Sequence, residues 1–161
     1  MKALVMSDSH GNRAGMQFIV SQARQRSGRV DAYIHLGDGA SDFLSLENFF
    51  RGLDSDCAMW QVRGNCDFSA PDVPLFRVVP FGGTQLYLTH GHRQMVKSTL
   101  AYLDEEAQGY ACSIALFGHT HQPDMEMGRV LKINPGSIQD GRIAFLEVSE
   151  GRPRVQLWHF A

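Results

Sequence analysis

Five apolar runs of this chain each lead into a short loop that carries Asp, His or Asn side chains. The loops are Asp8-Ser9-His10, Gly37-Asp38, Gly64-Asn65, Thr89-His90 and Gly118-His119-Thr120-His121. Carboxylate, imidazole and carboxamide donors together suit divalent transition metals better than calcium or an iron–sulfur cluster. Because such an ion lowers the pKa of bound water, these residue types indicate metal-dependent hydrolysis.

The spacing of the donors strengthens this interpretation. Side chains of an extended segment alternate between two sides, so Asp8 and His10 point the same way, as do His119 and His121. Either pair alone arises easily by chance, and a solvated loop would explain it. Five such loops in sequence, each after an expected strand, predict one polar site along one edge of a sheet.

Alternating strands and helices are expected to position these loops. The first half predicts buried strands at 2–7, 31–36 and 57–62, with helices at 14–26 and 41–53 between them. The second helix is too rich in apolar side chains for a surface helix. This order implies a parallel sheet with right-handed crossovers, and open α/β sheets bind ligands at the carboxyl ends of their strands.

The second half predicts more antiparallel pairing. Gly82 and Gly83, between strands at 75–80 and 84–89, are a hairpin signal. Met125 and Met127 alternate with acidic residues, which predicts a half-buried strand. The segment 64–74, rich in Pro, Asp and Ser, is interpreted as an active-site loop rather than a domain boundary. The remaining elements are a helix at 94–108 and strands at 112–117, 130–133, 142–148 and 154–159.

Composition narrows the class of protein. The 161 residues are 43% hydrophobic, which fits one folded domain over residues 1–161. A formal net charge of −2 argues against nucleic acid as a partner. No apolar run approaches the roughly 20 residues that span a membrane, so no membrane association is expected. Three cysteines without a disulfide spacing favour the reducing cytoplasm. Oligomeric state stays open, a homo-oligomer included.

In this order the loops resemble the signature of the calcineurin-like metallophosphoesterases, which runs Asp-x-His, Gly-Asp, Gly-Asn, a later His and Gly-His-x-His. The matching segments extend from residue 8 to residue 121, and Asn134-Pro135-Gly136-Ser137 also resembles a turn of the family. The short chain and Gly64-Asn65-Cys66-Asp67 are most similar to the small prokaryotic YfcE-like phosphodiesterases. The resemblance implies a four-layer αββα sandwich of two mixed β-sheets flanked by helices.

The resemblance also implies a centre of two divalent metal ions and a phosphate ester as substrate. Mn²⁺ is the first choice, and Fe, Zn, Ni and Co accept the same donors. A hydroxide that bridges the ions would attack phosphorus, most readily in a diester, and no protein nucleophile is needed. One ion would be held by Asp8, His10 and His121, the second by Asn65, His90 and His119, with Asp38 bridging both.

The chain departs from the family at Cys66, where many members have a His that assists the leaving group. A thiol does not titrate near pH 6.5 as imidazole does, so activated diesters are the expected substrates. His92 is the alternative proton donor and a candidate substrate-binding residue, although a solvent-exposed rim histidine is an equally good interpretation. Asn12 and Arg63 flank the metal loops and are candidates to bind phosphate.

Other interpretations of the same residues remain. Vps29 resembles this family yet serves mainly as a protein-interaction scaffold, so a metal-binding scaffold on the same expected fold is the alternative to an enzyme. A phosphomonoesterase would use the same metals, whereas a nuclease would need a larger basic surface. Among the remaining histidines, His35 is expected in the core and His159 in a structural or exposed position.

Overall fold

Alternate side chains of the first strand face two different hydrophobic layers. In β1 (Lys2–Met6), Ala3 and Val5 belong to one buried cluster, while Leu4 and Met6 belong to another. The first cluster takes residues from two sheets and lies between them. The second joins the outer face of one sheet to helices. The alternation of side chains along this one strand therefore already indicates three layers of the molecule: the helices, the sheet that contains β1, and the second sheet.

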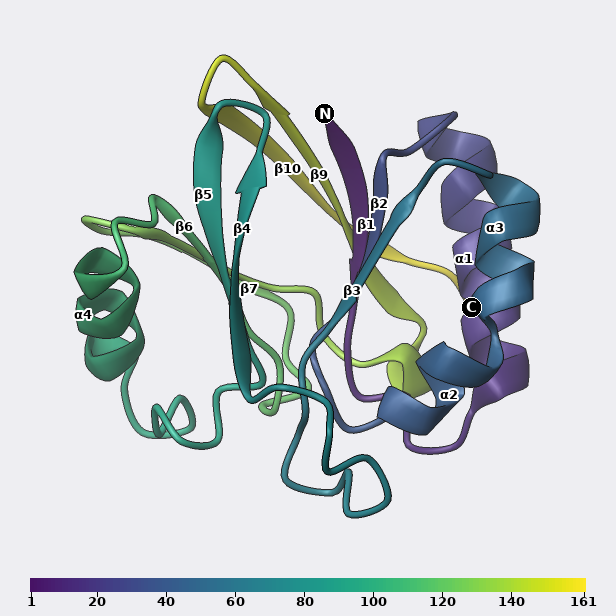
Figure 1. Ribbon diagram of the computed structural model, residues 1–161, viewed down its shortest axis with the longest axis horizontal. Coiled ribbons are helices and arrows are strands. Elements are labelled where there is room, and N and C mark those ends of the chain that lie inside the picture. Colours follow the sequence, from purple (N-terminus) through teal and green to yellow (C-terminus); the bar gives the residue numbers. More distant parts are fainter.

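The computed structural model describes residues 1–161 and has four layers, helix, sheet, sheet and helix (Figure 1). The first sheet has the strand order β10-β9-β1-β2-β3, in which β1, β2 and β3 are parallel and β9 and β10 antiparallel to their neighbours. Its other strands are β2 (Ala32–His35), β3 (Ala58–Gln61), β9 (Arg142–Ser149) and β10 (Arg152–His159).

The second sheet has the order β4-β5-β6-β8-β7, with β5, β6 and β8 parallel. The outer strands β4 and β7 pair antiparallel with β5 and β8. Its strands are β4 (Phe76–Phe81), β5 (Thr84–Thr89), β6 (Ile114–Leu116), β7 (Asp124–Met127) and β8 (Leu131–Asn134).

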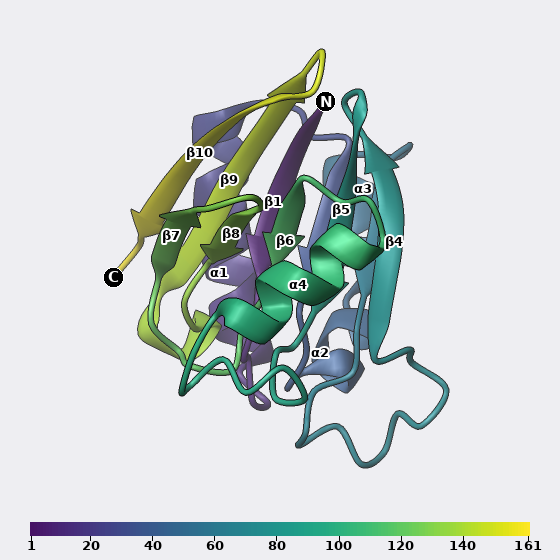
Figure 2. The ribbon, with the colours of Figure 1, turned by 90° about the vertical axis from the view of Figure 1, so that its left-hand side faces the viewer.

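Helices cover the outer face of each sheet (Figures 1 and 2). The first sheet is covered by α1 (Arg13–Ser27), α2 (Ala40–Ser45) and α3 (Glu47–Leu53), and the second by α4 (Ala101–Gly109). A short 3-10 turn, η1 (Ile138–Asp140), precedes β9. The predicted αββα sandwich of two mixed sheets is confirmed. None of the helices is both long and apolar enough to cross a membrane.

Three expectations about elements were wrong. The helix predicted at 41–53 is two helices that meet at Leu46, and Leu44 is 62% exposed. The helix predicted at 94–108 begins only at Ala101. Met125 and Met127 are both exposed rather than half-buried, because β7 is the outermost strand of its sheet.

The parallel strands of both sheets end at the same side of the sandwich. The backbone N–H of Asp8, after β1, donates to the carbonyl of Gly37, after β2. Likewise, the N–H of Gly118, after β6, donates to the carbonyl of His90, after β5. The loops that carry the predicted donors therefore meet where the two sheets come together, at the lower centre of Figure 1.

Candidate metal centre

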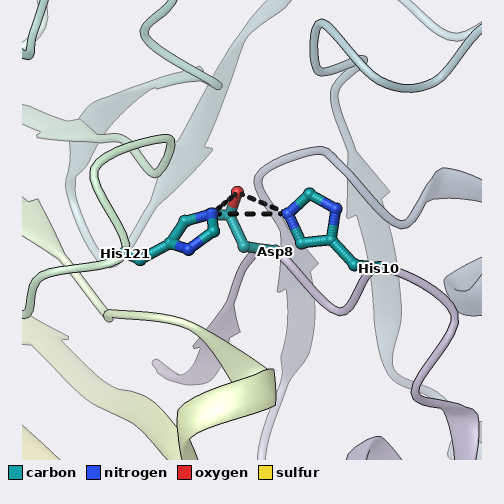
Figure 3. A group of neighbouring side chains, drawn as sticks. All are labelled: Asp8, His10 and His121. Atoms are coloured by element: carbon teal, nitrogen blue, oxygen red, sulfur yellow. Dashed lines mark hydrogen bonds and ion pairs between the residues drawn. The ribbon is translucent and has the colours of Figure 1, made fainter.

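Asp8, His10 and His121 form the first cluster of donors (Figure 3). The Oδ1 atom of Asp8 lies 3.1 Å from Nε2 of His121 and 3.5 Å from Nε2 of His10. The two imidazole Nε2 atoms lie 3.3 Å apart. Asp8 is fully buried, whereas His10 and His121 are partly exposed, so the cluster opens toward solvent on the imidazole side.

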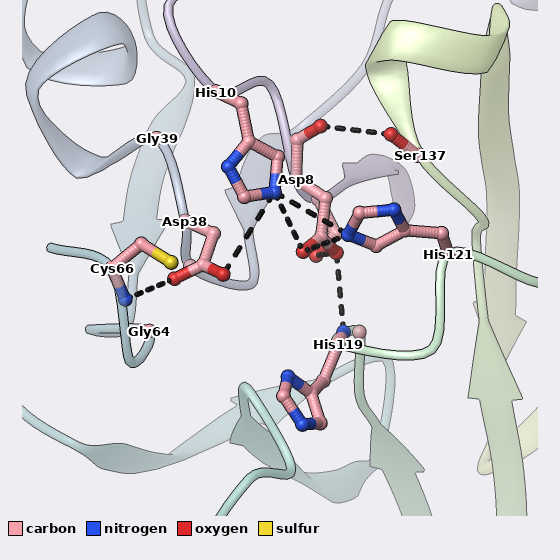
Figure 4. A network of polar contacts seen from close by, with 12 residues as sticks. Asp8, His10, Asp38, Gly39, Gly64, Cys66, His119, His121 and Ser137 are labelled. Carbon is pink, nitrogen blue, oxygen red and sulfur yellow. Dashed lines mark hydrogen bonds and ion pairs between the residues drawn. The ribbon is translucent and has the colours of Figure 1, made fainter. Parts of the chain in front are cut away.

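Asp38, His90 and His119 form the second cluster, directly beside the first. The Oδ2 atom of Asp38 lies 3.3 Å from Nε2 of His90 and 3.8 Å from Nε2 of His10. Its other oxygen, Oδ1, accepts the backbone N–H of Cys66 at 2.7 Å (Figure 4). Asp38 therefore turns one oxygen toward the protein and the other toward a histidine of each cluster.

The donor atoms have the spacing of ligands around a cation. Metal–ligand bonds of roughly 2.0–2.2 Å put two adjacent ligands roughly 2.8–3.1 Å apart in octahedral geometry and roughly 3.3–3.6 Å apart in tetrahedral geometry. The 3.1 to 3.5 Å separations of the first cluster agree with this spacing. Two buried atoms, Oδ1 of Asp8 and Nε2 of His90, have no hydrogen-bond partner. Because buried polar atoms are rarely left unpaired, the residues fit divalent metal ions.

Five of the seven predicted ligands have positive backbone φ angles, which residues other than glycine rarely adopt. The positive φ angles are 56° at Asp8, 44° at His10, 56° at Asp38, 69° at His119 and 62° at His121. Each costs about 1–3 kcal/mol and persists only where the surrounding structure holds it. Such strain gathers at functional sites, so its concentration on these residues supports their assignment to one site.

Backbone hydrogen bonds hold the strained loops together. The N–H of His10 donates to the carbonyl of Asp38 at 3.0 Å, and the N–H of His119 donates to Oδ2 of Asp8 at 3.1 Å. The hydroxyl of Ser137 donates to the carbonyl of Asp8 at 2.9 Å (Figure 4). Asn134 donates its amide to the carbonyl of Gly118 at 3.1 Å. The turn at 134–137 therefore supports two of the metal loops.

Two buried carboxylates, for which the sequence predicted no role, position these loops. Asp67 accepts backbone N–H groups from Asp38, Gly39, Ala40 and Gly64 at 2.8 to 3.0 Å. It thereby joins the loop after β2 to the loop after β3. The only signal in the sequence was the position of Asp67 two residues after the Gly64-Asn65 pair. That position did not indicate the four N–H groups that its carboxylate accepts.

Asp42 does the same for the first metal loop. Its carboxylate accepts the hydroxyl of Ser9 at 2.7 Å, the N–H of Gly11 at 2.8 Å and the Arg13 guanidinium at 3.2 Å. A carboxylate at a buried position of an expected helix was the only signal in the sequence. Both residues bind backbone or neighbouring side chains and not the candidate centre, so they act by positioning it.

Burial and neighbouring charge set the protonation of the clustered groups. Burial would raise the pKa of Asp38, but the nearby His90 imidazole and the N–H of Cys66 outweigh it and hold that pKa well below its usual range. Burial and the nearby His90 lower the pKa of His119 to about 4. His119 is thus neutral near pH 7, and a neutral imidazole can offer a lone pair to a metal.

The other predicted site residues lie around the two clusters. The thiol of Cys66 is close to the donor atoms of His10 and Asp38. The amide of exposed Asn65 points to this thiol, 3.5 Å from its sulfur. The ring centroid of His92 lies 5.4 Å from that of His90 and 6.1 Å from that of His119.

The structure gives local roles to the residues expected to bind phosphate. Asn12 caps α1 by accepting the N–H of Gly15 at 2.9 Å, and its side chain is exposed. Arg63 donates to the carbonyl of Pro71 at 2.9 Å and so holds the segment 64–74. Of the histidines outside the site, His35 is fully buried and His159 is exposed, as expected.

Comparisons with known proteins agree with this geometry. The family model described as the calcineurin-like phosphoesterase superfamily domain matches residues 1–149. A probable metallophosphoesterase, YsnB from Bacillus subtilis, is 35% identical over 144 residues, which cover 89% of this chain and 78% of YsnB.

Two solved structures share the fold at lower identity. The structure titled as a novel archaeal phosphodiesterase is 22% identical, with a TM-score of 0.72, and the match covers 98% of this chain and all of that one. Wild-type Vps29 from Entamoeba histolytica, in complex with Zn²⁺, is 19% identical, with a TM-score of 0.70 over the whole of both chains. From the family model and the relative in Bacillus, we conclude that the chain belongs to the calcineurin-like phosphoesterase superfamily.

Proposed function

We propose that the protein is a two-metal phosphoesterase that acts preferentially on phosphodiesters. The observation that carries the proposal is the convergence of the two donor clusters, with Oδ1 of Asp8 and Nε2 of His90 buried and unpaired between them. Structural neighbours with this fold include a protein titled as a phosphodiesterase. The fold alone does not fix the substrate, so the preference for diesters is carried over from that neighbour and is the part of the proposal that the substrate panel below tests.

The proposed ligand sets follow the two clusters. Asp8, His10 and His121 hold one ion, and His90 and His119 hold the other together with Asn65. Asp38 bridges, because its Oδ2 atom faces His90 at 3.3 Å and His10 at 3.8 Å. Asn65, on the adjacent loop, would complete the second set with its side-chain amide, which in this structure lies 3.5 Å from the Cys66 sulfur. Mn²⁺ is the first choice, with Fe, Zn, Ni and Co as alternatives.

When bound, the two ions supply a water of lowered pKa and stabilise negative charge on the phosphoryl oxygens. The protein supplies the arrangement of donors and the charge balance. Two divalent ions against the carboxylates of Asp8 and Asp38 leave a local charge of about +2, which attracts a phosphate ester to a chain of net charge −2.

Cys66 bears on the choice of substrate. Burial and the carboxylate of Asp38 raise the pKa of its thiol, so Cys66 stays protonated near pH 7. A thiol of raised pKa is a poor proton donor to a leaving group, which favours esters whose leaving groups depart without a proton. His92 is the other candidate donor. Its Nδ1 atom is buried without a partner, and burial and His90 lower its pKa.

A scaffold role is the second candidate function. Vps29 shares the fold and, in the zinc complex, binds a metal as well. Metal binding alone therefore does not separate an enzyme from a scaffold. Turnover separates them, and the test has to measure it.

The test is a panel of aryl and alkyl phosphate diesters and monoesters, assayed on metal-stripped protein with each metal restored in turn. We expect metal-dependent hydrolysis of diesters, strongest with Mn²⁺, that falls ~100-fold or more in Asp38→Asn. Binding of metal without turnover of any ester would favour the scaffold. Faster turnover of monoesters than of diesters would favour a phosphomonoesterase.

A further inference from the structure

A cavity of 340 Å³ lies beside the candidate metal centre on the outer side of the second sheet. Its walls come from the start of β4, the end of β5, the turns after His90 and the helix α4, which lie together in Figure 2. Sites for small molecules occupy roughly 300–1,000 Å³, so this one suits a single small group. The lining residues are Leu75, Phe76, Thr89, His92, Arg93, Gln94 and Glu106.

His92 connects the cavity to the centre. Its ring lines the cavity and lies 5.4 Å, between centroids, from the ring of His90. Thr89, on another wall, directly precedes His90 and pairs across the sheet with Phe76. Through His92 and Thr89, the cavity therefore adjoins the second donor cluster at His90.

A hydrogen-bonded polar wall lines one side of the cavity. Gln94 is 6% exposed, accepts the hydroxyl of Thr89 at 3.1 Å and donates to Oε2 of Glu106 at 2.8 Å. Tyr87 donates to Oε1 of Glu106 at 2.7 Å. The Gln94 amide keeps a second proton, and each Glu106 oxygen keeps a second lone pair. The wall therefore offers a donor beside an acceptor, and the proposed metal chemistry uses neither.

Another wall of the cavity is aromatic, in contrast to the polar wall. The ring of Phe76 stacks on Tyr87, with centroids 5.5 Å apart and planes at 17°, and packs against Tyr110 at 5.1 Å. Phe76 still exposes 38% of its surface. Arg93, exposed at the rim, adds a positive charge. Flat rings of bound ligands stack on such side chains.

We propose that this cavity binds one of the two ester groups of the substrate and selects a nucleoside there, a flat ring with a hydrogen-bonding edge. The inference rests on the proposed phosphodiesterase function. Phe76 stacks on the ring, while Gln94 and Glu106 bond to its edge. These residues determine specificity and take no part in the attack on phosphorus.

The activity test compares two substrates that share one leaving group. Methyl p-nitrophenyl phosphate and the p-nitrophenyl esters of the four common nucleoside 5′-monophosphates differ only in the second ester group. With Mn²⁺ restored, kcat/KM for at least one nucleotide ester should exceed that for the methyl ester by at least ~10-fold, the scale of one well-filled pocket. Phe76→Leu keeps the apolar bulk without the ring and should bring the ratio near one.

Phe18→Leu is the matched control, because Phe18 is a half-exposed phenylalanine on α1, outside the site. Its ratio should stay at the wild-type value. A wild-type ratio near one for all four nucleotides, or a ratio that Phe76→Leu leaves unchanged, overturns the assignment of the cavity.

A binding measurement separates this inference from the proposed function. Metal-free protein is titrated with each nucleoside alone and followed by the side-chain amide signal of Gln94 in ¹⁵N-correlated NMR spectra. We expect saturable shifts in the wild type that weaken at least ~10-fold in Phe76→Leu. If no ester is hydrolysed but these shifts occur, the phosphodiesterase function fails and the nucleoside site stands. If no nucleoside shifts the signal, the nucleoside site fails whatever the activity.

Discussion

At the scale of single residues, Asp38 links the two halves of the centre. Its Oδ2 atom faces a histidine of each cluster, so Asp38→Asn removes a charge from both proposed metal sites at once. We expect kcat/KM to fall ~100-fold or more with loss of bound metal. Asn65→Ala removes one neutral ligand and should cost less. Metal analysis with kinetics on diesters checks both variants, and near wild-type turnover and metal content in Asp38→Asn would refute the bridging role.

Cys66 is the residue that sets the expected leaving-group preference. Aryl diesters such as bis(p-nitrophenyl) phosphate should react far faster than alkyl esters, with a steep dependence of rate on leaving-group pKa. General-acid assistance is worth about 10²–10⁴-fold, so Cys66→His should flatten this dependence and raise activity on alkyl esters. A shallow dependence in the natural protein that becomes steep in His92→Ala would instead assign the proton to His92.

The residue types of the centre could be predicted from the sequence, but their supports could not. Asp8, His10, Asp38, His90, His119 and His121 lie in two contiguous clusters, as their order along the chain suggested. Asp67 and Asp42 escaped notice because a carboxylate that binds backbone N–H groups has no fixed spacing to its partners. Only the folded arrangement of the loops shows which donors they meet.

At the scale of elements, Asp67 ties the loop after β2 to the loop after β3. Asp67→Asn replaces an acceptor of four N–H groups by an amide that must turn a donor toward some of them. We expect metal affinity to fall about 10–100-fold, the usual cost of losing an outer partner of a metal ligand. Metal titration measures this, with Asp72→Asn as the control, an exposed carboxylate of the same loop. Equal affinities for both variants would contradict the positioning role.

The helix predicted at 94–108 shows why periodicity misled at this scale. Val96, Leu100, Leu103 and Ala107 have helical spacing, and all contribute to the cluster between α4 and the second sheet. Residues before Ala101 reach that cluster through turns, because the N–H groups of Gln94 and Val96 both donate to Gly91 and Met95 has a φ of 56°. A hydrophobic pattern reports which side chains are buried, not the backbone that buries them.

At the scale of the whole molecule, the burial of His35 makes stability depend on pH. Burial lowers the pKa of His35 to about 4, whereas an unfolded chain has about 6.5. Above pH 6.5 both states hold a neutral imidazole. As the pH falls from about 6.5 toward 4, only the unfolded chain takes up the proton, so stability is lost, by about 2 kcal/mol at pH 5.

Urea unfolding of metal-free protein at pH 7 and pH 5 measures this loss. His35→Gln should lose about 2 kcal/mol less than the wild type between the two pH values, whatever its stability at pH 7. His159→Gln, the same change at an exposed histidine, should lose as much as the wild type. A loss in His35→Gln equal to that of the wild type would show that His35 is not the group responsible.

Part of the architecture followed from local pattern and part did not. The alternation of strands and helices in the first half predicted that β1, β2 and β3 are parallel, because each of these elements can be recognised from the hydrophobic pattern of a short segment. The pairing of β1 with β9 joins residues such as Leu4 and Phe145, about 140 positions apart in the chain. Such long-range pairing has no local signal, so the four layers were expected only from the family resemblance.

The central claim is that the seven loop residues hold two metal ions, and anomalous diffraction from crystals grown with Mn²⁺ tests it most directly. Anomalous scattering locates each ion independently of activity. The account predicts two peaks roughly 3.5–4 Å apart, one against Asp8, His10 and His121, the other against Asn65, His90 and His119, with Asp38 touching both. A single peak, or ions bound away from these side chains, would contradict it.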